Sequence, residues 1–140
     1  MKSPQELAER FRAEGRKVTP QRQRIFEALH GNGDHPTAEL VWDEVRPDMP
    51  TMSLKTVYQT LHELAELGEI QSLDLGTGAA RFDPNVDVHH HLVCEECGRV
   101  RDLYADFDDV RVPKATAHGY EVWSTEIVFR GRCPDCTARP

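Results

Sequence analysis

The chain has 140 residues and a formal net charge of −7 at neutral pH. A chain of this length forms one domain or two small ones, and small domains often need a metal ion or a partner subunit for stability. We find no apolar run long enough to span a membrane, and the opening residues MKSPQE lack the apolar core of a signal peptide. We therefore expect a cytoplasmic protein with no membrane partner, whose cysteine thiols stay reduced.

Basic residues are concentrated near the N-terminus in spite of the negative net charge. Between residues 10 and 24, six arginines and lysines accompany one glutamate, which gives a local charge of +5 (6 − 1). Arg16, Lys17 and Arg22 belong to this basic patch. Such a patch on an acidic protein indicates contact with nucleic acid, although an ordinary solvated helix face has the same composition.

Four helices are expected in the first half of the chain. The first covers residues 5–13, and the fourth runs from Ser53 through Leu67 with apolar side chains at helical spacing. The second and third begin after Thr19 and Thr37, and the hydroxyl groups of these residues and of Ser53 can each cap a helix.

A β-hairpin is expected after the helices. Residues 70–75 and 79–82 have the composition of two strands, joined through Gly76, Thr77 and Gly78. Helices followed by a two-stranded wing describe a winged helix. The short interval between the third and fourth helices predicts a helix-turn-helix, in which the fourth helix enters the major groove of DNA.

Polar side chains on the fourth helix suit contact with DNA. Lys55 suits a phosphate, whereas Thr56 and Gln59 are short enough to reach base edges. Tyr58 can stack on a sugar or on a thymine methyl group, and it is equally compatible with a half-buried core position. The predicted DNA-contacting set comprises Arg16, Lys17, Arg22, Ser53, Lys55, Thr56, Tyr58 and Gln59.

The cysteines form two C-x2-C pairs separated by 35 residues. Each pair turns two thiolates toward one point, and two pairs complete the tetrahedral four-sulfur shell that Zn²⁺ prefers. Two disulfides or a thioredoxin-like redox pair are the alternatives, but paired C-x2-C motifs without further cysteines favour zinc. The predicted structural zinc ligands are Cys94, Cys97, Cys133 and Cys136.

The composition changes after residue 85, where a run of histidines leads directly into the first cysteine pair. On a strand, His89 and His91 point to one face and His90 to the other. Two imidazoles beside a cysteine pair are expected to bind a metal. Three further elements are expected: a strand over residues 99–103, a weak helix over 106–117 and a strand over 121–129.

Taken together, these motifs resemble the ferric uptake regulator (Fur) family of metal-dependent bacterial transcription factors, over nearly the whole chain. The matching segments are TPQR at 19–22, DHPTA at 34–38, SLKTVY at 53–58, ARFD at 80–83, HHHLVC at 89–94 and the two cysteine pairs. The resemblance implies an α+β fold. Residues 1–84 would form a winged helix-turn-helix DNA-binding domain, and residues 85–140 a small α/β dimerisation and metal-binding domain with a four-cysteine structural zinc. It also implies a homodimeric repressor of a palindromic double-stranded DNA operator.

The same resemblance implies a regulatory metal at the hinge between the domains. Carried over by motif, its ligands are His35, Asp83, His89, His91 and Asp102. Imidazoles and carboxylates form a nitrogen and oxygen site suited to Fe²⁺ or Mn²⁺, unlike the thiolate site. A metal held by both domains would fix the angle between them and so couple metal binding to DNA binding.

The two carboxylate ligands, Asp83 and Asp102, are both aspartates. In this the chain resembles the peroxide-sensing (PerR-type) members of the family, whereas iron-sensing members tend to carry glutamate at these positions. The implied signal is oxidation of His35 and His89 by peroxide at bound iron. Val88, His90 and Thr125 depart from the pattern of a further metal site in iron regulators, which argues against such a site here. An iron-, manganese-, zinc- or nickel-responsive uptake regulator is the alternative.

Two other classes of function fit less well. We do not expect an enzyme, because the segment HELAE at 62–66 begins like the H-E-x-x-H metalloprotease motif but ends in glutamate. A zinc-binding storage or chaperone module would explain the histidines and cysteines but not the winged helix. Metal-dependent binding to a palindromic duplex would separate a regulator from both.

Overall fold

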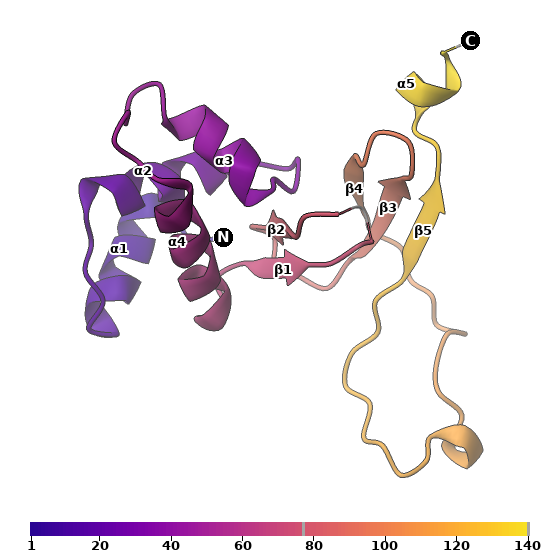
Figure 1. The fold of residues 1–140 in the computed structure, drawn as a ribbon. Coiled ribbons are helices and arrows are strands. Elements are labelled where there is room, and N and C mark those ends of the chain that lie inside the picture. The colour runs from indigo at the N-terminus through magenta and orange to yellow at the C-terminus, as the bar shows by residue number, and fades with distance from the viewer. Residues whose placement is uncertain (77, 140) are drawn as a thin grey trace. The chain divides into compact units, whose positions relative to one another are not determined.

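The computed structural model describes residues 1–76 and 78–139 and divides the chain into two compact units, Met1–Asp87 and Val88–Pro140 (Figure 1). Thr77, in the middle of the predicted hairpin turn, lies outside the described residues. Among the helices that the structure describes, none combines the length and the hydropathy that a membrane span needs.

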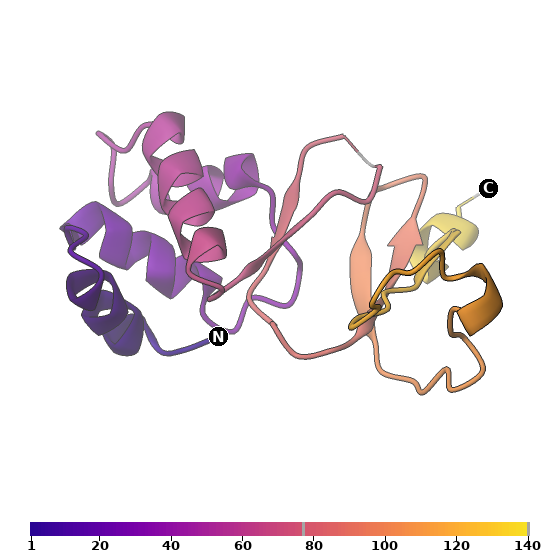
Figure 2. The ribbon, with the colours of Figure 1, turned by 90° about the horizontal axis from the view of Figure 1, so that it is seen from below.

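The first unit is built on four helices, which Figure 2 shows gathered around a common centre. They are α1 (Pro4–Ala13), α2 (Pro20–Leu29), α3 (Ala38–Val45) and α4 (Leu54–Glu66). Each starts after a hydroxyl side chain that accepts a hydrogen bond from the backbone N–H three residues further on, in the order Ser3, Thr19, Thr37 and Ser53. Such a cap stabilises a helix by about 1 kcal/mol. The three predicted caps are thus confirmed.

Aromatic and aliphatic side chains fill the centre of the first unit. The rings of Phe11 and Phe26 meet edge to face with their centroids 5.0 Å apart, and both are fully buried. Leu61 and Leu64 of α4 pack into the same core, and Phe82 joins it from the hairpin. This core fixes the position of α4, whose exposed side carries Lys55 and Gln59 of the predicted DNA-contacting set.

The hairpin consists of β1 (Gln71–Leu73) and β2 (Arg81–Asp83), paired antiparallel and shorter than predicted. Strand β2 is also fastened to the loop before α3. The Phe82 N–H donates to the carbonyl oxygen of Pro36 at 2.9 Å, and the Arg81 guanidinium donates to the carbonyl oxygen of His35 at 3.0 Å. These bonds hold the loop that carries His35 beside Asp83.

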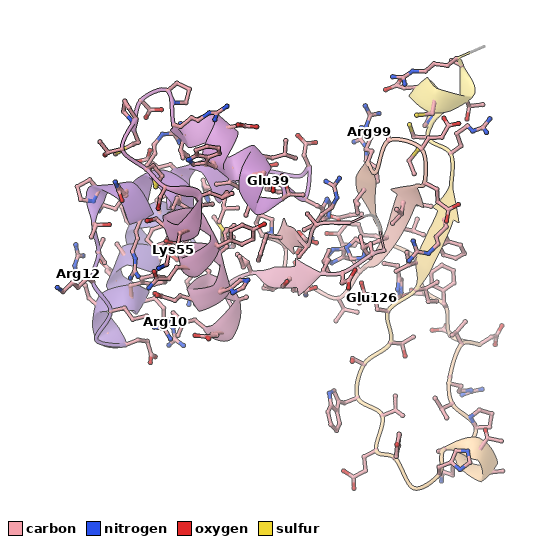
Figure 3. The ribbon with its side chains drawn as sticks, in the orientation of Figure 1. Arg10, Arg12, Glu39, Lys55, Arg99 and Glu126 are labelled. Carbon is pink, nitrogen blue, oxygen red and sulfur yellow. The ribbon has the colours of Figure 1, made fainter. Side chains whose placement is uncertain are left out.

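The basic patch is largely paired with acidic side chains of the same unit. Arg22 forms a 2.9 Å ion pair with Glu63 of α4, and Arg16 reaches the same carboxylate at 3.3 Å. By contrast, Arg12 is exposed and projects away from α1, and Lys55 is exposed on α4 (Figure 3). The local excess of positive charge therefore overstates the charge that is open to solvent.

The second unit is a three-stranded sheet with the order β4-β3-β5. Its elements are β3 (His90–Cys94), β4 (Val100–Leu103), β5 (Val128–Gly131) and the short helix α5 (Pro134–Thr137). Strand β3 lies in the middle, antiparallel to β4 and parallel to β5. The chain therefore has to cross from one edge of the sheet to the other between β4 and β5.

That crossing segment differs from the prediction. The predicted helix over 106–117 is wrong, because only a 3₁₀ turn, η1 (Lys114–Thr116), forms there. Pro113 lacks the N–H group that a helix interior needs, and its ring clashes with the preceding turn. The strand predicted over 121–129 begins only at Val128, where pairing with His91 of β3 starts. Residues without a partner strand do not stay extended as a sheet.

We predict that Arg22 holds the first unit together. Its guanidinium pairs with Glu63, donates to the carbonyl oxygen of Lys17 at 2.8 Å and lies 5.3 Å from the centroid of the Phe11 ring. Arg22→Ala should lower the free energy of unfolding by about 1–3 kcal/mol, since hydrogen bonds to charged, half-buried groups contribute in that range. Urea unfolding followed by circular dichroism measures this loss. Arg12→Ala, an exposed control, should change stability by less than about 0.5 kcal/mol, and equal losses for the two variants would contradict the assignment.

Candidate metal-binding sites

The four cysteines converge at one end of the sheet in the second unit. They are free thiols, and their sulfur atoms all lie within 4.8 Å of one another. The sulfurs of Cys97 and Cys133 are 3.7 Å apart. A tetrahedron with Zn–S bonds of about 2.3 Å has edges of about 3.8 Å, so the cluster fits a zinc ion.

Local backbone geometry explains why the cysteine pairs form this cluster. The Gly98 N–H donates to the carbonyl oxygen of Cys94 at 2.9 Å, which closes a tight turn, and Gly98 has a φ of +76° that other residues rarely adopt. The Glu95 N–H donates to the carbonyl oxygen of Gly131 at 2.8 Å and so ties the first pair to the end of β5. Cys133 directly precedes α5, whose first residue is Pro134.

The cysteines do not ionise alike. Backbone N–H groups of Cys97 and Cys133 point at the Cys94 sulfur and lower the pKa of its thiol to about 6. A hydrogen bond with the Cys133 sulfur, together with burial, raises the pKa of the Cys136 thiol above its ordinary value. Four thiolates repel one another in so small a space unless a divalent cation neutralises them. The charge distribution of the cluster therefore also fits a metal ion.

A buried histidine–aspartate pair lies in the first unit. The Nε2 atom of His35 is 3.1 Å from an Asp83 carboxylate oxygen, and both side chains are almost wholly buried. His35 has a φ of +52°, a left-handed conformation that costs a non-glycine residue of order 1 kcal/mol. Strained residues of this kind persist where the surrounding structure holds them and are concentrated at functional sites.

A second cluster of imidazoles and carboxylate lies in the second unit. His89 Nε2 is 3.0 Å from Asp102 Oδ1, and His91 Nε2 is 3.6 Å from the same oxygen. The two imidazole rings meet at a centroid distance of 4.7 Å. Asp102 faces His91 across the β3–β4 pairing, so the sheet register places the carboxylate beside the imidazoles. This arrangement presents two nitrogens and one oxygen to a single point.

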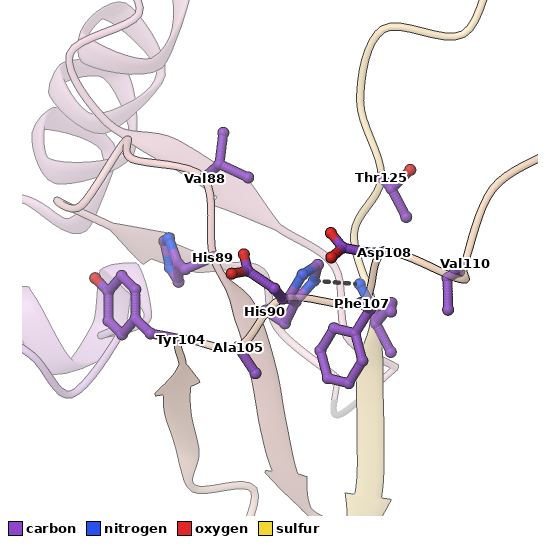
Figure 4. Close-up of a pocket in the computed structure, with 11 residues that line it drawn as sticks. Val88, His89, His90, Tyr104, Ala105, Phe107, Asp108, Val110 and Thr125 are labelled. Carbon is purple, nitrogen blue, oxygen red and sulfur yellow. Dashed lines mark hydrogen bonds between the residues drawn. The ribbon is translucent and has the colours of Figure 1, made fainter.

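His90 points to the other face of β3 and has a different role. Its Nδ1 atom accepts a hydrogen bond from the Ile127 N–H at 3.0 Å, and its ring packs edge to face on Phe107 (Figure 4). These contacts fasten the crossing segment to the sheet beside a surface pocket of about 540 Å³. The expected alternation along the strand is thereby observed, with His90 away from its two neighbours.

Two neighbours of the histidines carried no signal in the sequence. The Tyr104 ring stacks on His89 at a centroid distance of 5.4 Å, and Glu126 lies 3.0 Å from Nδ1 of His91. Glu126 is 35 residues from His91 in the sequence. Only the parallel pairing of β5 with β3, which the residue pattern does not reveal, brings them together.

The predicted DNA-contacting residues occupy different environments in the first unit. Lys17, Lys55 and Gln59 are exposed. The Ser53 and Thr56 hydroxyl groups lie 3.0 Å apart at the start of α4, where Ser53 also caps the helix. Tyr58 is half-buried against the core and packs edge to face with His62. Arg16 and Arg22 face Glu63, as described above.

Comparisons with known proteins place the chain in one family. The model of the ferric uptake regulator family matches residues 13–130. The peroxide-responsive repressor PerR of Staphylococcus saprophyticus is 32% identical over 127 residues, which cover 90% of this chain and 86% of the relative. PerR from Streptococcus pyogenes, a protein of peroxide sensing and gene regulation, is 28% identical with a TM-score of 0.56, covering 97% of this chain and 94% of that one.

The fold is also that of the Helicobacter pylori ferric uptake regulator Fur. The two structures have a TM-score of 0.78 at 20% identity, covering 96% of this chain and 91% of that one. The match of a family model to most of the chain, the repressor relative that spans nearly its whole length and the shared fold agree with one another. The chain belongs to the ferric uptake regulator family.

Proposed function

We propose that this protein is a metal-dependent, DNA-binding transcriptional repressor that senses peroxide through a site made of histidine and aspartate. The observation that carries the proposal is the presence of two preformed sets of nitrogen and oxygen donors, one in each unit. His35 and Asp83 belong to the first unit, and His89, His91 and Asp102 to the second. Nitrogen and oxygen donors in this ratio suit Fe²⁺ or Mn²⁺.

Neither set of donors alone fills the coordination shell of a divalent metal ion. One set offers two ligands and the other three, whereas divalent iron and manganese take five or six. Asp83 and His89 are six residues apart in the sequence, so an extended chain between them spans at most about 20 Å. One metal ion bound by all five residues would therefore hold the two units in a fixed relation. That relation is the proposed link between metal occupancy and DNA binding.

The four-cysteine cluster is the proposed structural zinc site. Four sulfur ligands fill the tetrahedral shell of Zn²⁺ and leave no position for a substrate or signal. The ion would join the end of β3 to the segment after β5, since each contributes two cysteines. Binding of this kind adds directly to the free energy of folding.

The proposed DNA contact is made by α4 and the residues near it. Lys17 and Lys55 are exposed cations suited to phosphate, while Thr56 and Gln59 lie on the helix proposed to enter the major groove. Ser53, Tyr58, Arg16 and Arg22 remain in the proposed set. For Arg16 and Arg22, a phosphate would have to replace Glu63 as the partner.

The second unit is the proposed dimerisation domain. Its crossing segment exposes large apolar side chains, with Trp123 at 88%, Tyr120 at 80% and Val122 at 55% exposure. A soluble chain rarely leaves such a group uncovered, and a second copy of the same segment would cover it symmetrically. A homodimer presents two copies of α4, which is the geometry that a palindromic operator requires.

Peroxide sensing follows from the chemistry of the proposed ligands. Bound iron would supply the reactivity that transfers one oxygen atom from hydrogen peroxide to an adjacent imidazole, with release of water. The product, 2-oxo-histidine, is a poorer ligand. His35 and His89 are the proposed targets, on the resemblance to peroxide-sensing members of the family. Loss of one ligand would release the metal and then the DNA.

The first prediction of this proposal concerns zinc. Cys136→Ser should abolish zinc binding and, with it, the compactness and dimerisation of the second unit, because three sulfurs hold the ion far less tightly than four. Metal analysis, thermal unfolding and light scattering measure the three effects. Asp135→Asn alters the neighbouring residue without removing a sulfur and should keep zinc and dimer. If the Cys136→Ser protein melts at the wild-type temperature and keeps the wild-type dimer mass, the four cysteines do not form a structural zinc site.

The second prediction concerns DNA. Lys17→Gln and Lys55→Gln should each reduce the slope of log K against log salt by roughly one unit, because each removes one phosphate contact. Tyr58→Ala should weaken the specific site more than random duplex. Lys114→Gln, in the second unit, is the charge-matched control and should leave the slope unchanged. Equal slopes for all the lysine variants and the wild type would show that the proposed docking face is wrong.

The third prediction decides between peroxide and metal as the signal. Peroxide treatment of the Fe²⁺ form should add about 16 daltons (one oxygen) to the peptides that carry His35 and His89, and should abolish DNA binding. The Mn²⁺ form should bind DNA and gain no mass. Asp102→Glu should keep metal-dependent DNA binding but blunt the peroxide response, because the longer side chain alters the coordination. Unmodified peptides and persistent DNA binding would instead indicate an iron or other metal uptake regulator.

A further inference from the structure

We infer that Glu126 is a positioning residue for the regulatory metal, acting through the imidazole of His91. This inference rests on the proposed function, since it concerns the same ligand set. Its basis is the geometry around His91. One ring nitrogen, Nδ1, lies 3.0 Å from a Glu126 carboxylate oxygen, while the other, Nε2, faces Asp102.

The two nitrogens of a neutral imidazole have opposite roles. One carries the proton and donates, and the other accepts or binds metal. The Glu126 oxygen is within reach of Nδ1 but not in line with its N–H, and a small rotation of the half-exposed Glu126 side chain brings it into line. A carboxylate in that position accepts only, so it holds the proton on Nδ1 and leaves the lone pair of Nε2 for a metal. Nε2 is also the nitrogen that shares Asp102 with His89, whose own Nε2 is 3.0 Å from the same oxygen. Glu126 therefore selects the tautomer that the metal needs.

The surroundings show that the contact is built into the sheet. The His91 N–H donates to the carbonyl oxygen of Ile127 at 3.1 Å, so the residue after Glu126 is hydrogen-bonded to the ligand strand. The His91 side chain is 1% exposed, whereas that of Glu126 is 48% exposed (labelled in Figure 3). A buried imidazole with one carboxylate on each side is the arrangement in which an outer carboxylate orients a metal-binding histidine.

A surface ion pair is the simpler explanation of the same contact. In that case Glu126 would stabilise the sheet slightly, and its removal would not affect the choice of tautomer or the affinity for metal. The two explanations differ in what they predict for His91 itself. Outer carboxylates of this type change metal affinity by about 10–100-fold.

The experiment uses full-length, zinc-loaded protein and Mn²⁺ as the probe. Competition with a chromophoric chelator should show a 10–100-fold loss of Mn²⁺ affinity for Glu126→Ala. Glu126→Gln keeps an acceptor oxygen but not the charge, and it should lie between Glu126→Ala and the wild type. Glu121→Ala removes a similar exposed carboxylate from the same segment and should bind Mn²⁺ like the wild type. Zinc content and urea unfolding of all variants should be unchanged.

A second measurement reads the tautomer without the regulatory metal. Long-range ¹H–¹⁵N spectra of the zinc-loaded protein should show His91 protonated at Nδ1 in the wild type and a mixture of tautomers in Glu126→Ala. If the wild type binds Mn²⁺ and Glu126→Ala binds it equally well, the inference is overturned and the proposed function stands. If the wild type itself does not bind Mn²⁺, the proposed function fails. The spectra then decide the inference: identical His91 signals in the two proteins would overturn it.

Discussion

The pleat of β3 is the constraint on which both candidate metal sites depend. The strand carries His91 and, three residues later, Cys94, so one short element serves the imidazole cluster and the cysteine cluster. Alternation along the strand sends His91 toward Asp102 and His90 toward the crossing segment. A metal that fixes Cys94 therefore also fixes the direction in which His91 points. Metal at the proposed structural site would therefore help to order the strand that carries ligands of the proposed regulatory site.

Charge has a more local meaning in the first unit than its composition indicates. Two arginines of the basic patch, Arg22 and Arg16, are matched by Glu63. These pairs are partly buried, so water and salt screen them less than surface pairs. The exposed cations of this region are Arg12, Lys17 and Lys55, of which Lys17 and Lys55 belong to the proposed DNA contact. On the proposed docking face, attraction to a polyanion would thus depend mainly on the exposed Lys17 and Lys55.

The features that could be predicted from the sequence are those that depend on contacts between residues close together in the chain. Thr19, Thr37 and Ser53 could be recognised as caps because a cap and its helix are adjacent, and the cysteine pairs because each pair is a local turn. The Arg22–Glu63 pair could not be predicted, since the partners are 41 residues apart and many other carboxylates were equally available. Glu126 was missed for the same reason.

The prediction for the segment between β4 and β5 was wrong for a different reason. Phe107 packs on the sheet, but Tyr120, Val122 and Trp123 are exposed, so their pattern does not report on the fold of a single copy. A pattern of hydrophobic residues predicts secondary structure only when the surface that buries them belongs to the same chain. Here the proposed burial is against a second copy, and the conformation of the segment would depend on that contact.

Preformed half-sites determine how the energy of metal binding is used. His35 is held in its strained conformation by the bond from Arg81 to its carbonyl oxygen, and His89 and His91 are held by the sheet. These side chains would therefore lose little conformational entropy on binding a metal. Under the proposed function, the free energy of coordination would be available to favour one relation of the two units over others, which is what a shift in population requires. In the proposed mechanism, damage to a single imidazole would remove a ligand from one half-site, and that would be enough, because the proposed metal would join the units only while both halves bind it.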